Sequence, residues 1–171
     1  MSDDEDLEIR HVNAEDLLEL GQVLGVPHAH FYRARLSQRG VVLSAWRKGE
    51  LAGAILVSWE PPDEPELRQH LPGVPMLYRL QVHAEMRRRG VATALVRAAE
   101  ELLIGRGHRA VASGVDPANK PAVLLYQSLG FRRWNHGEIA TVRELYDDDG
   151  RLVIKPDRCL IFVRRLTASR G

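Results

Sequence analysis

The stretch that decides the fold covers residues 76–93 and reads Met-Leu-Tyr-Arg-Leu-Gln-Val-His-Ala-Glu-Met-Arg-Arg-Arg-Gly-Val-Ala-Thr. Side-chain types alternate along its first part, which predicts a strand over Met76–Val82. The alternation assigns one set of side chains to each face: Met76, Tyr78, Leu80 and Val82 to one, Leu77, Arg79 and Gln81 to the other. Beyond the arginines, apolar residues recur at helical spacing and predict a helix from near Gly90 to about Arg106.

The loop between this strand and this helix has the features of an anion-binding site. A helix N-terminus presents unpaired N–H groups and about half a positive charge. Gly90 and Ala92 keep side-chain bulk away from those amides, and Arg87, Arg88 and Arg89 add positive charge at the same end. An oligophosphate suits both features. The alternative is a solvated basic turn, and neither the Walker A nor the dinucleotide-binding glycine pattern is present.

The rest of the chain predicts further strands and helices around this unit. Expected strands cover Leu7–Val12, Val41–Trp46, Leu51–Trp59, Ala110–Val115, Arg132–Arg143 and Cys159–Leu166, and expected helices cover Ala14–Leu24, His28–Gln38 and Pro121–Leu129. Asn13 is the expected N-cap of the first helix, and Gly130 the left-handed cap of the last. Arg97 and Glu101 have the spacing of a helical ion pair. Hairpins on both sides of a strand–helix–strand centre predict an α/β domain with a mixed sheet.

The segment Glu60–Pro75 stands apart because it holds five prolines and scattered charges. We expect it to lack regular structure. Loops of this length inside a compact domain are usually functional or disordered. Our interpretation is a flap on the substrate side of the molecule, and the alternative is an inert insertion.

Composition narrows the class of protein. The chain has 171 residues, 44% of them hydrophobic and 27% charged, which predicts one globular domain over residues 1–171. A net charge of +1 argues against nucleic-acid or anionic-membrane partners. The lone Cys159 excludes a disulfide framework and a multi-cysteine zinc site, and we expect no metal. No apolar run approaches the roughly 20 residues of a membrane span. The acidic start, Asp3–Asp6, is unlike a signal peptide and is expected to be a solvated tail, so we expect a cytoplasmic protein.

Three motifs occur in order along the chain. They are Arg87-x-x-Gly90-x-Ala92, Asn119-x-x-Ala122 and Leu125-Tyr126-x-x-Leu129-Gly130-Phe131. Together, with a strand before the first and another before the second, they resemble the GCN5-related N-acetyltransferase (GNAT) superfamily. The resemblance covers about Leu77 to Phe131. It implies a single-domain α/β (α+β) fold with a central mixed, mostly antiparallel sheet flanked by helices.

The resemblance also implies an activity, namely transfer of the acetyl group of acetyl-CoA to a primary amine by direct attack in a ternary complex. On this basis Val82 supplies a backbone N–H to the oxyanion, and Tyr126 protonates the departing thiolate. The implied contacts of the CoA arm and its pyrophosphate are Leu80, Gln81, Val82, Arg87, Arg88, Arg89, Gly90, Val91, Ala92, Thr93, Asn119, Ala122 and Tyr126. No metal is implied.

Tyr126 suits the role of general acid on chemical grounds. A phenol with a pKa near 10 is protonated at neutral pH and can donate to a thiolate. The alternative is a packed core tyrosine, because Ala122, Leu125 and Leu129 share its helical stripe.

The general base is harder to assign. Some members of the superfamily carry a glutamate five residues before the asparagine, where this chain has Gly114. Glu60, His83 and Glu138 are the candidate bases, and a water chain or an acceptor of low pKa would also serve. Trp59, Glu60, Trp134 and Glu138 are the candidate acceptor-binding residues, although either tryptophan would equally serve core or dimer packing.

Two other functions stay open. One is a non-catalytic CoA-binding regulatory module that lost its base, and the other is an acyltransferase for a longer acyl-CoA. The acceptor itself is not defined by the sequence. A homodimer is favoured only because closed two-fold dimers are common.

Overall fold

The computed structural model describes residues 6–167, so the predicted acidic tail lies outside the described residues except for Asp6. Its elements are β1 (Leu7–His11), η2 (Ala14–Asp16), α1 (Leu17–Leu24), α2 (Val26–Arg35), β2 (Gly40–Arg47), β3 (Glu50–Ser58), α3 (Pro65–His70), β4 (Met76–Val82), η3 (Ala84–Met86), α4 (Val91–Gly105), β5 (Ala110–Val115), α5 (Lys120–Ser128), β6 (Arg132–Arg133), β7 (Ile139–Tyr146) and β8 (Leu152–Arg165). None of the helices described is long and apolar enough to cross a membrane.

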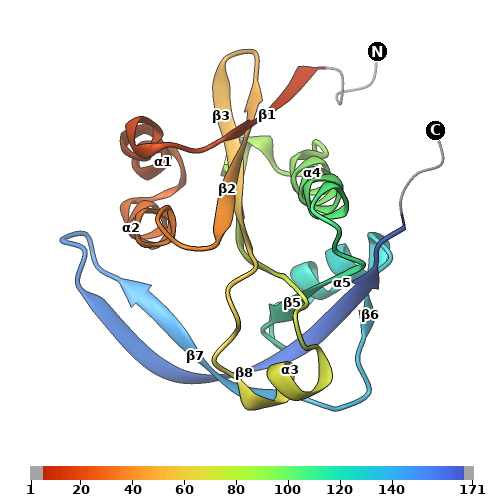
Figure 1. The fold of residues 1–171 in the computed structure, drawn as a ribbon. Helices are drawn as coiled ribbons and strands as arrows, with labels where there is room; N and C mark the ends of the chain where they lie inside the picture. The colour runs from red at the N-terminus through yellow and green to blue at the C-terminus, as the bar shows by residue number, and fades with distance from the viewer. Residues whose placement is uncertain (1–5, 168–171) are drawn as a thin grey trace.

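One twisted sheet organises the molecule (Figure 1). Its strand order is β1-β2-β3-β4-β5-β8-β6, and β7 pairs with β8 off this path. Every pairing is antiparallel except that of β4 with β5. The predicted mixed, mostly antiparallel sheet is therefore confirmed, with the parallel pair at its centre.

Three apolar clusters hold the helices against this sheet. The largest lies beneath α4 and α5 and includes Leu95, Leu103 and Phe162. The second lies on the opposite face, beneath α1 and α2. Figure 1 shows these two helices on one side of β2 and β3 and α4 on the other. The third joins α3 to β4, β5, β7 and β8 through Leu67, Ile139 and neighbouring residues. Burial of complete aliphatic side chains on both faces is the main stabilising term.

Local signals place several helix ends where the sequence predicts them. The Asn13 side chain accepts from the Glu15 N–H at 2.9 Å, and the Asp16 carboxylate accepts from the Asn13 N–H at 2.9 Å, which completes a capping box. Pro121 lies in the first turn of α5, where its missing N–H costs nothing. Gly130 adopts a φ of +91° just beyond that helix, as expected of a left-handed cap.

Several element boundaries were predicted wrongly. Helix α2 begins at Val26, because Pro27 occupies its first turn and does not break it. Helix α3 lies inside the segment that we expected to lack regular structure, and it begins at a proline for the same reason. The predicted strand over Arg132–Arg143 is divided into β6 and β7. Strand β8 begins at Leu152, before the predicted Cys159, because residues 152–159 pair with β7.

The predicted ion pair between Arg97 and Glu101 is also wrong. Arg97 contacts Glu100 at 2.6 Å, and the other Glu100 oxygen contacts Arg164 at 2.7 Å. Glu100 is only 5% exposed, so the two guanidinium groups compensate a carboxylate that faces the core.

A bulge in β4 interrupts the alternation predicted for that strand. The pairing register with β3 shifts between Ala54 and Leu56, and Arg79 takes a left-handed φ of +49°. As a result, Met76 and Tyr78 pack with the third cluster, whereas Leu80 and Val82 pack against the cluster beneath α4. The Tyr32 hydroxyl donates to the Arg79 carbonyl at 2.5 Å, which helps to offset backbone strain of about 1–3 kcal/mol.

Candidate active site

Strands β4 and β5 part shortly after they begin to pair. Their Cα partners are only Met76 with Ala112 and Leu77 with Ser113, and the Ala112 N–H also donates to the Pro75 carbonyl at 3.0 Å. Within residues 6–167, no β5 partner is found for β4 beyond Leu77. The two strands therefore diverge at their carboxyl ends, and this divergence, called the slot below, lies where open α/β sheets bind ligands.

The backbone of β4 presents a hydrogen-bonding edge to this slot. The His83 N–H donates to the Ala52 carbonyl of β3 at 2.8 Å. Because hydrogen-bonding directions alternate along a strand, the N–H of Val82 points to the opposite edge, away from β3. The Val82 carbonyl on that edge accepts from Arg87 Nε at 3.4 Å. Val82 and Arg87 thus lie together beside the slot.

The loop after η3 brings backbone amides to the same end of the sheet. Gly90 is the N-cap of α4 with a φ of +81°, and it makes no side-chain cap. The first helical bond runs from the Ala94 N–H to the Gly90 carbonyl at 2.9 Å. The N–H groups of residues 91–93 precede this bond and have no acceptor within the helix. Arg87, Arg88 and Arg89 surround them and are exposed.

A buried arginine from the neighbouring hairpin supports this loop from below. Arg47, at the end of β2, is 7% exposed and donates from Nη2 to the Arg89 carbonyl at 2.9 Å. Arg88 takes a left-handed φ of +64° in the same turn. The basic loop is therefore a shaped turn fixed to the sheet, as an anion cradle requires.

Tyr126 lies on the α5 face of the sheet, beside Ser113. It is 5% exposed and packs edge-on against Phe131, with ring centroids 5.1 Å apart. Burial raises the pKa of its hydroxyl, and a hydrogen bond with the Ser113 side chain opposes that rise. Ser113 is the last β5 residue paired with β4, and its own hydroxyl donates to the Leu77 carbonyl at 3.3 Å. Tyr126 is thus a packed side chain whose hydroxyl contacts Ser113, next to the point where β4 and β5 part.

Asn119 has a local structural task. It is the N-cap of α5, and its side-chain oxygen accepts from the Ala122 N–H at 3.2 Å. Its amide nitrogen keeps both donors for another partner.

A cavity of about 410 Å³ lies on the other face of the sheet, opposite Tyr126. Successive strand residues point to opposite faces, so Ser113 faces α5 and Gly114 faces the cavity. Leu56, Met76, Tyr78, Ile161 and Phe31 form apolar parts of its wall, and Glu60, Asp63 and Glu64 contribute carboxylates. A Cβ atom added to Gly114 would lie 3.2 Å from Cys159 Sγ.

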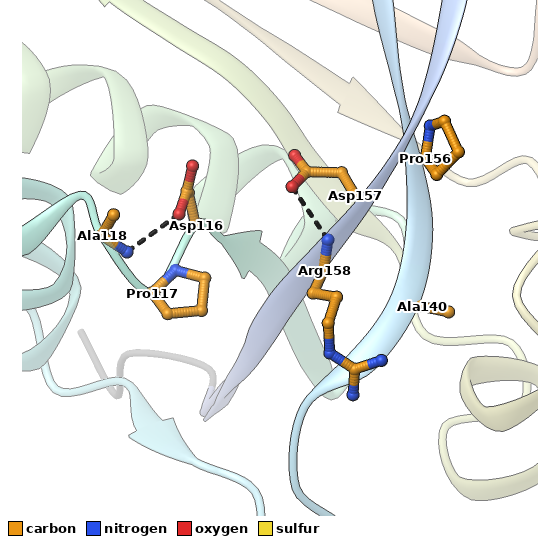
Figure 2. A pocket seen from close by; sticks show the side chains of 7 residues that line it. All are labelled: Asp116, Pro117, Ala118, Ala140, Pro156, Asp157 and Arg158. Atoms are coloured by element: carbon orange, nitrogen blue, oxygen red, sulfur yellow. Dashed lines mark hydrogen bonds between the residues drawn. The ribbon is translucent and has the colours of Figure 1, made fainter.

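A shallower hollow adjoins this cavity between the β5–α5 turn and the β7–β8 hairpin (Figure 2). Asp116 and Asp157 stand on its two sides, and each accepts a hydrogen bond from a nearby backbone N–H. Arg143 joins the two carboxylates at 2.8 and 3.0 Å. The two carboxylates that line the hollow are thus already paired with Arg143 and with backbone N–H groups.

The structure distributes the candidate bases over different places. Glu60 lines the cavity, but its Oε1 accepts from the Arg39 N–H at 2.8 Å. His83 Nδ1 accepts from the Glu85 N–H at 3.2 Å, so a neutral ring carries its proton on Nε2 and has no lone pair left for the slot. Glu138 is exposed and contacts Arg158 at 3.3 Å.

The two candidate acceptor-binding tryptophans lie elsewhere. Trp59 packs against the cluster beneath α4, with the Arg106 guanidinium 3.9 Å above its ring. Trp134 packs against α3, edge-on to His70, and donates to the Gly137 carbonyl at 2.7 Å. Both side chains serve packing and lie outside the cavity lining.

One further group in the cavity wall, Glu64, escaped sequence reasoning. Glu64 lines the cavity, and its Oε1 accepts from the Thr141 hydroxyl of β7 at 2.7 Å. Cys159 lies in the same wall and is partly buried, as its apolar neighbours in the sequence indicate. Burial, with a contribution from Glu64, raises the pKa of the Cys159 thiol to about 12. That thiol stays protonated at neutral pH and is not a nucleophile. The sequence feature that could have pointed to Glu64 is its position in the proline-rich segment Glu60–Pro75, which we interpreted as a substrate-side flap.

The comparisons with known proteins agree with this geometry. The model of the acetyltransferase (GNAT) family matches residues 8–131, more than half of the chain. The chain therefore belongs to the GNAT acetyltransferase family. Comparison with curated proteins found no match.

Solved structures share the fold over nearly the whole chain. The ribosomal-protein-S18-alanine N-acetyltransferase of Escherichia coli is 20% identical, with a TM-score of 0.66, and covers 95% of this chain and 96% of its own. NAA60 of Arabidopsis thaliana, solved with a bisubstrate analogue, is 21% identical, with a TM-score of 0.67 and coverages of 95% and 99%. The putative acetyltransferase yncA of Salmonella typhimurium, solved with acetyl-CoA, is 17% identical, with a TM-score of 0.64 and coverages of 97% and 97%.

Proposed function

We propose that the protein transfers the acetyl group of acetyl-CoA to a primary amine by direct attack in a ternary complex. The observation that supports the proposal is the parting of β4 and β5, which leaves the Val82 N–H without a β5 partner in the described part of the chain, while Tyr126 bonds Ser113 at the point where the pairing ends. Membership of the GNAT acetyltransferase family indicates the class of reaction, which is acetyl transfer.

The chain has the groups that a CoA thioester needs. The amides of residues 91–93 and the loop Arg87–Gly90 fit a diphosphate, since they combine free N–H donors with positive charge. The open edge of β4 over Leu80–Val82 fits the amides of the pantetheine arm, which would add to the sheet like a further strand. The Asn119 amide nitrogen, at the N-cap of α5, is a further donor for the CoA arm, and Ala122 lies in the first turn of that helix.

In the proposed reaction, the amine and the general acid act from opposite faces of the sheet. The amine nitrogen approaches from the cavity and forms a bond to the thioester carbon, while the Val82 N–H stabilises the oxyanion. The carbon–sulfur bond then breaks, and the sulfur takes a proton from the Tyr126 hydroxyl on the opposite face. Because burial raises the pKa of Tyr126, its hydroxyl keeps that proton through the physiological range.

Binding of acetyl-CoA to two glycine variants tests the cradle. Gly90 and Gly49 both have left-handed φ values, +81° and +78°, and Gly49 lies in the β2–β3 turn with no atom within 4 Å of an added Cβ. Gly90→Val should weaken acetyl-CoA binding at least tenfold in calorimetry, because the branched side chain crowds the amides. Gly49→Val carries a similar backbone cost and should bind normally. Equal affinities in the two variants would refute the cradle.

A non-catalytic CoA-binding module is the second candidate, and Gly114 is the observation that favours it. A carboxylate is missing from β5 where some members of the superfamily have one. Steady-state release of CoA with a panel of primary amines separates the two functions. Tight acetyl-CoA binding without amine-dependent release would favour the module.

A further inference from the structure

In the proposed function, no group has yet been assigned to take the proton from the ammonium of the acceptor. The assignment of such a group rests on the proposed function. A lysine-like ammonium with a pKa of about 10.4 is neutral in only about one part in 2,500 at pH 7. Only the neutral amine attacks a thioester, so a group in the cavity that takes the proton would accelerate the reaction. Gly114 offers no side chain for this purpose.

Glu64 projects into the cavity from the segment before α3. It is half-buried, and it lines the same cavity as Gly114 and Tyr78. The hydrogen bond from the Thr141 hydroxyl to Oε1, at 2.7 Å, links the segment before α3 to β7 in the wall of the cavity. Glu64 also contributes to the raised pKa values of both Tyr78 and Cys159, so its charge lies near the wall that includes Gly114.

The cations around this cavity are already occupied, and Glu64 is not one of their partners. Arg35 pairs with Glu144. Arg143 pairs with Asp116 and Asp157, and Arg158 pairs with Glu138. Arg79 donates to the Glu144 carbonyl and lies over the Phe31 ring. None of the ion pairs found in residues 6–167 includes Glu64.

A carboxylate in that setting attracts a positively charged group. Glu60 and Asp63 add further negative charge to the same cavity wall, whereas its floor and sides include Leu56, Met76 and Ile161. The chemistry of the cavity therefore matches an ammonium carried on an apolar body. An acceptor with a carboxylate next to its amine fits this wall poorly.

We propose that Glu64 is the general base of the reaction: it binds the ammonium of the acceptor in the cavity and takes its proton before attack. The ammonium N–H bond breaks and the proton passes to the Glu64 carboxylate. The neutral nitrogen then bonds to the thioester carbon, the carbon–sulfur bond breaks, and Tyr126 protonates the sulfur. The second proton of the attacking nitrogen leaves to solvent, which returns one proton to Tyr126, and Glu64 releases its proton as product leaves.

The first test compares Glu64→Gln with Glu101→Gln, a matched change on the exposed side of α4. The probes are phenethylamine, tyramine, octylamine and a tetrapeptide with a free N-terminus. Glu64→Gln should lower kcat about 10²–10⁴-fold and remove the acidic limb of the pH–rate profile. Glu101→Gln should leave both unchanged. Unaltered acetyl-CoA affinity and melting temperature of Glu64→Gln show that the variant is folded.

Thr141→Val tests the role of Glu64 through the pH–rate profile, which a purely structural role of Glu64 would not change. The Thr141 hydroxyl donates to Oε1 of Glu64 and orients the carboxylate in the cavity. Its loss should displace the acidic limb of the pH–rate profile, which Glu101→Gln leaves in place. A limb that stays in place in both Glu64→Gln and Thr141→Val would overturn the assignment.

Binding and rescue give independent evidence. With CoA present, calorimetry should show that the wild-type protein binds phenethylamine more tightly than its uncharged analogue 2-phenylethanol, and that Glu64→Gln abolishes this preference. Adding Gly114→Glu together with Cys159→Ala, which removes the sulfur 3.2 Å from the new Cβ, should restore part of the lost rate. Wild-type turnover that Glu64→Gln does not slow would refute the base alone, whereas acetyl-CoA binding with no acetylated amine would refute the proposed function.

Discussion

Alanine at two glycine positions should change stability in opposite directions, although the chemical change is the same. A Cβ on Gly53 would lie 2.6 Å from the Gln81 carbonyl oxygen, 3.1 Å from Val91 Cγ1 and 3.3 Å from Leu95 Cδ1. A Cβ on Gly105, the last residue of α4, would meet nothing within 4 Å. Gly53 therefore allows β3 to lie close both to β4 and to the first turn of α4.

The expected magnitudes follow from these contacts. Gly53→Ala must displace backbone as well as side chains, so we expect a loss of about 1–3 kcal/mol in the free energy of unfolding, as for other overpacked sites. That corresponds to a fall of roughly 2–12 °C in melting temperature for a domain of this size. Gly105→Ala should gain about 0.5–1 kcal/mol, because alanine restricts the unfolded chain and suits a helix.

Urea denaturation measures both variants, with the slope of the transition as a check that the unfolding stays two-state. Acetyl-CoA titration of Gly53→Ala adds a functional readout, since the displaced strand carries the open edge at Val82. We expect weaker binding for Gly53→Ala and normal binding for Gly105→Ala. A Gly53→Ala protein as stable as the wild type would refute the close packing of β3, β4 and α4.

Two predictions concern titratable groups at the slot and the cavity. Tyr126→Phe should slow acetyl transfer about 10²–10⁴-fold without weakening acetyl-CoA binding. The control Tyr146→Phe should leave the rate of acetyl transfer unchanged. An unchanged rate in Tyr126→Phe would remove Tyr126 from the mechanism. Cys159 should react with iodoacetamide about 10³-fold more slowly at pH 8 than a thiol of pKa 9, and its rate should keep rising with pH up to a pKa of about 12. Rapid labelling at pH 8 would contradict the burial of that thiol.

The centre of the fold was predictable because its signals are local. The bounds of β4 and β5 agree with the predicted Met76–Val82 and Ala110–Val115, since short apolar runs ended by polar or turn residues define them. The caps at Asn13 and Gly130 depend on neighbouring residues only. The GNAT motifs are equally local, and the family assignment was confirmed.

The missed features depend on contacts between distant residues. The bulge at Arg79 is held by the hydroxyl of Tyr32, which alternation along β4 cannot report. Likewise, the contact of Glu64 with Thr141 of β7 joins residues 77 positions apart, which the sequence does not indicate. The prediction that residues 60–75 lack regular structure was wrong for a different reason. Pro65 is the first residue of α3, where a proline does not interrupt the helix.

The adjacent residues Ser113 and Gly114 make β5 a partition between two compartments. On the proposed function, the compartment for the thioester is built from segments within residues 8–131, the range that the family model matches. Part of the wall of the other compartment comes from β7 and β8, which lie beyond that range. Under this proposal, remodelling of the C-terminal hairpin changes the acceptor while the donor compartment stays the same.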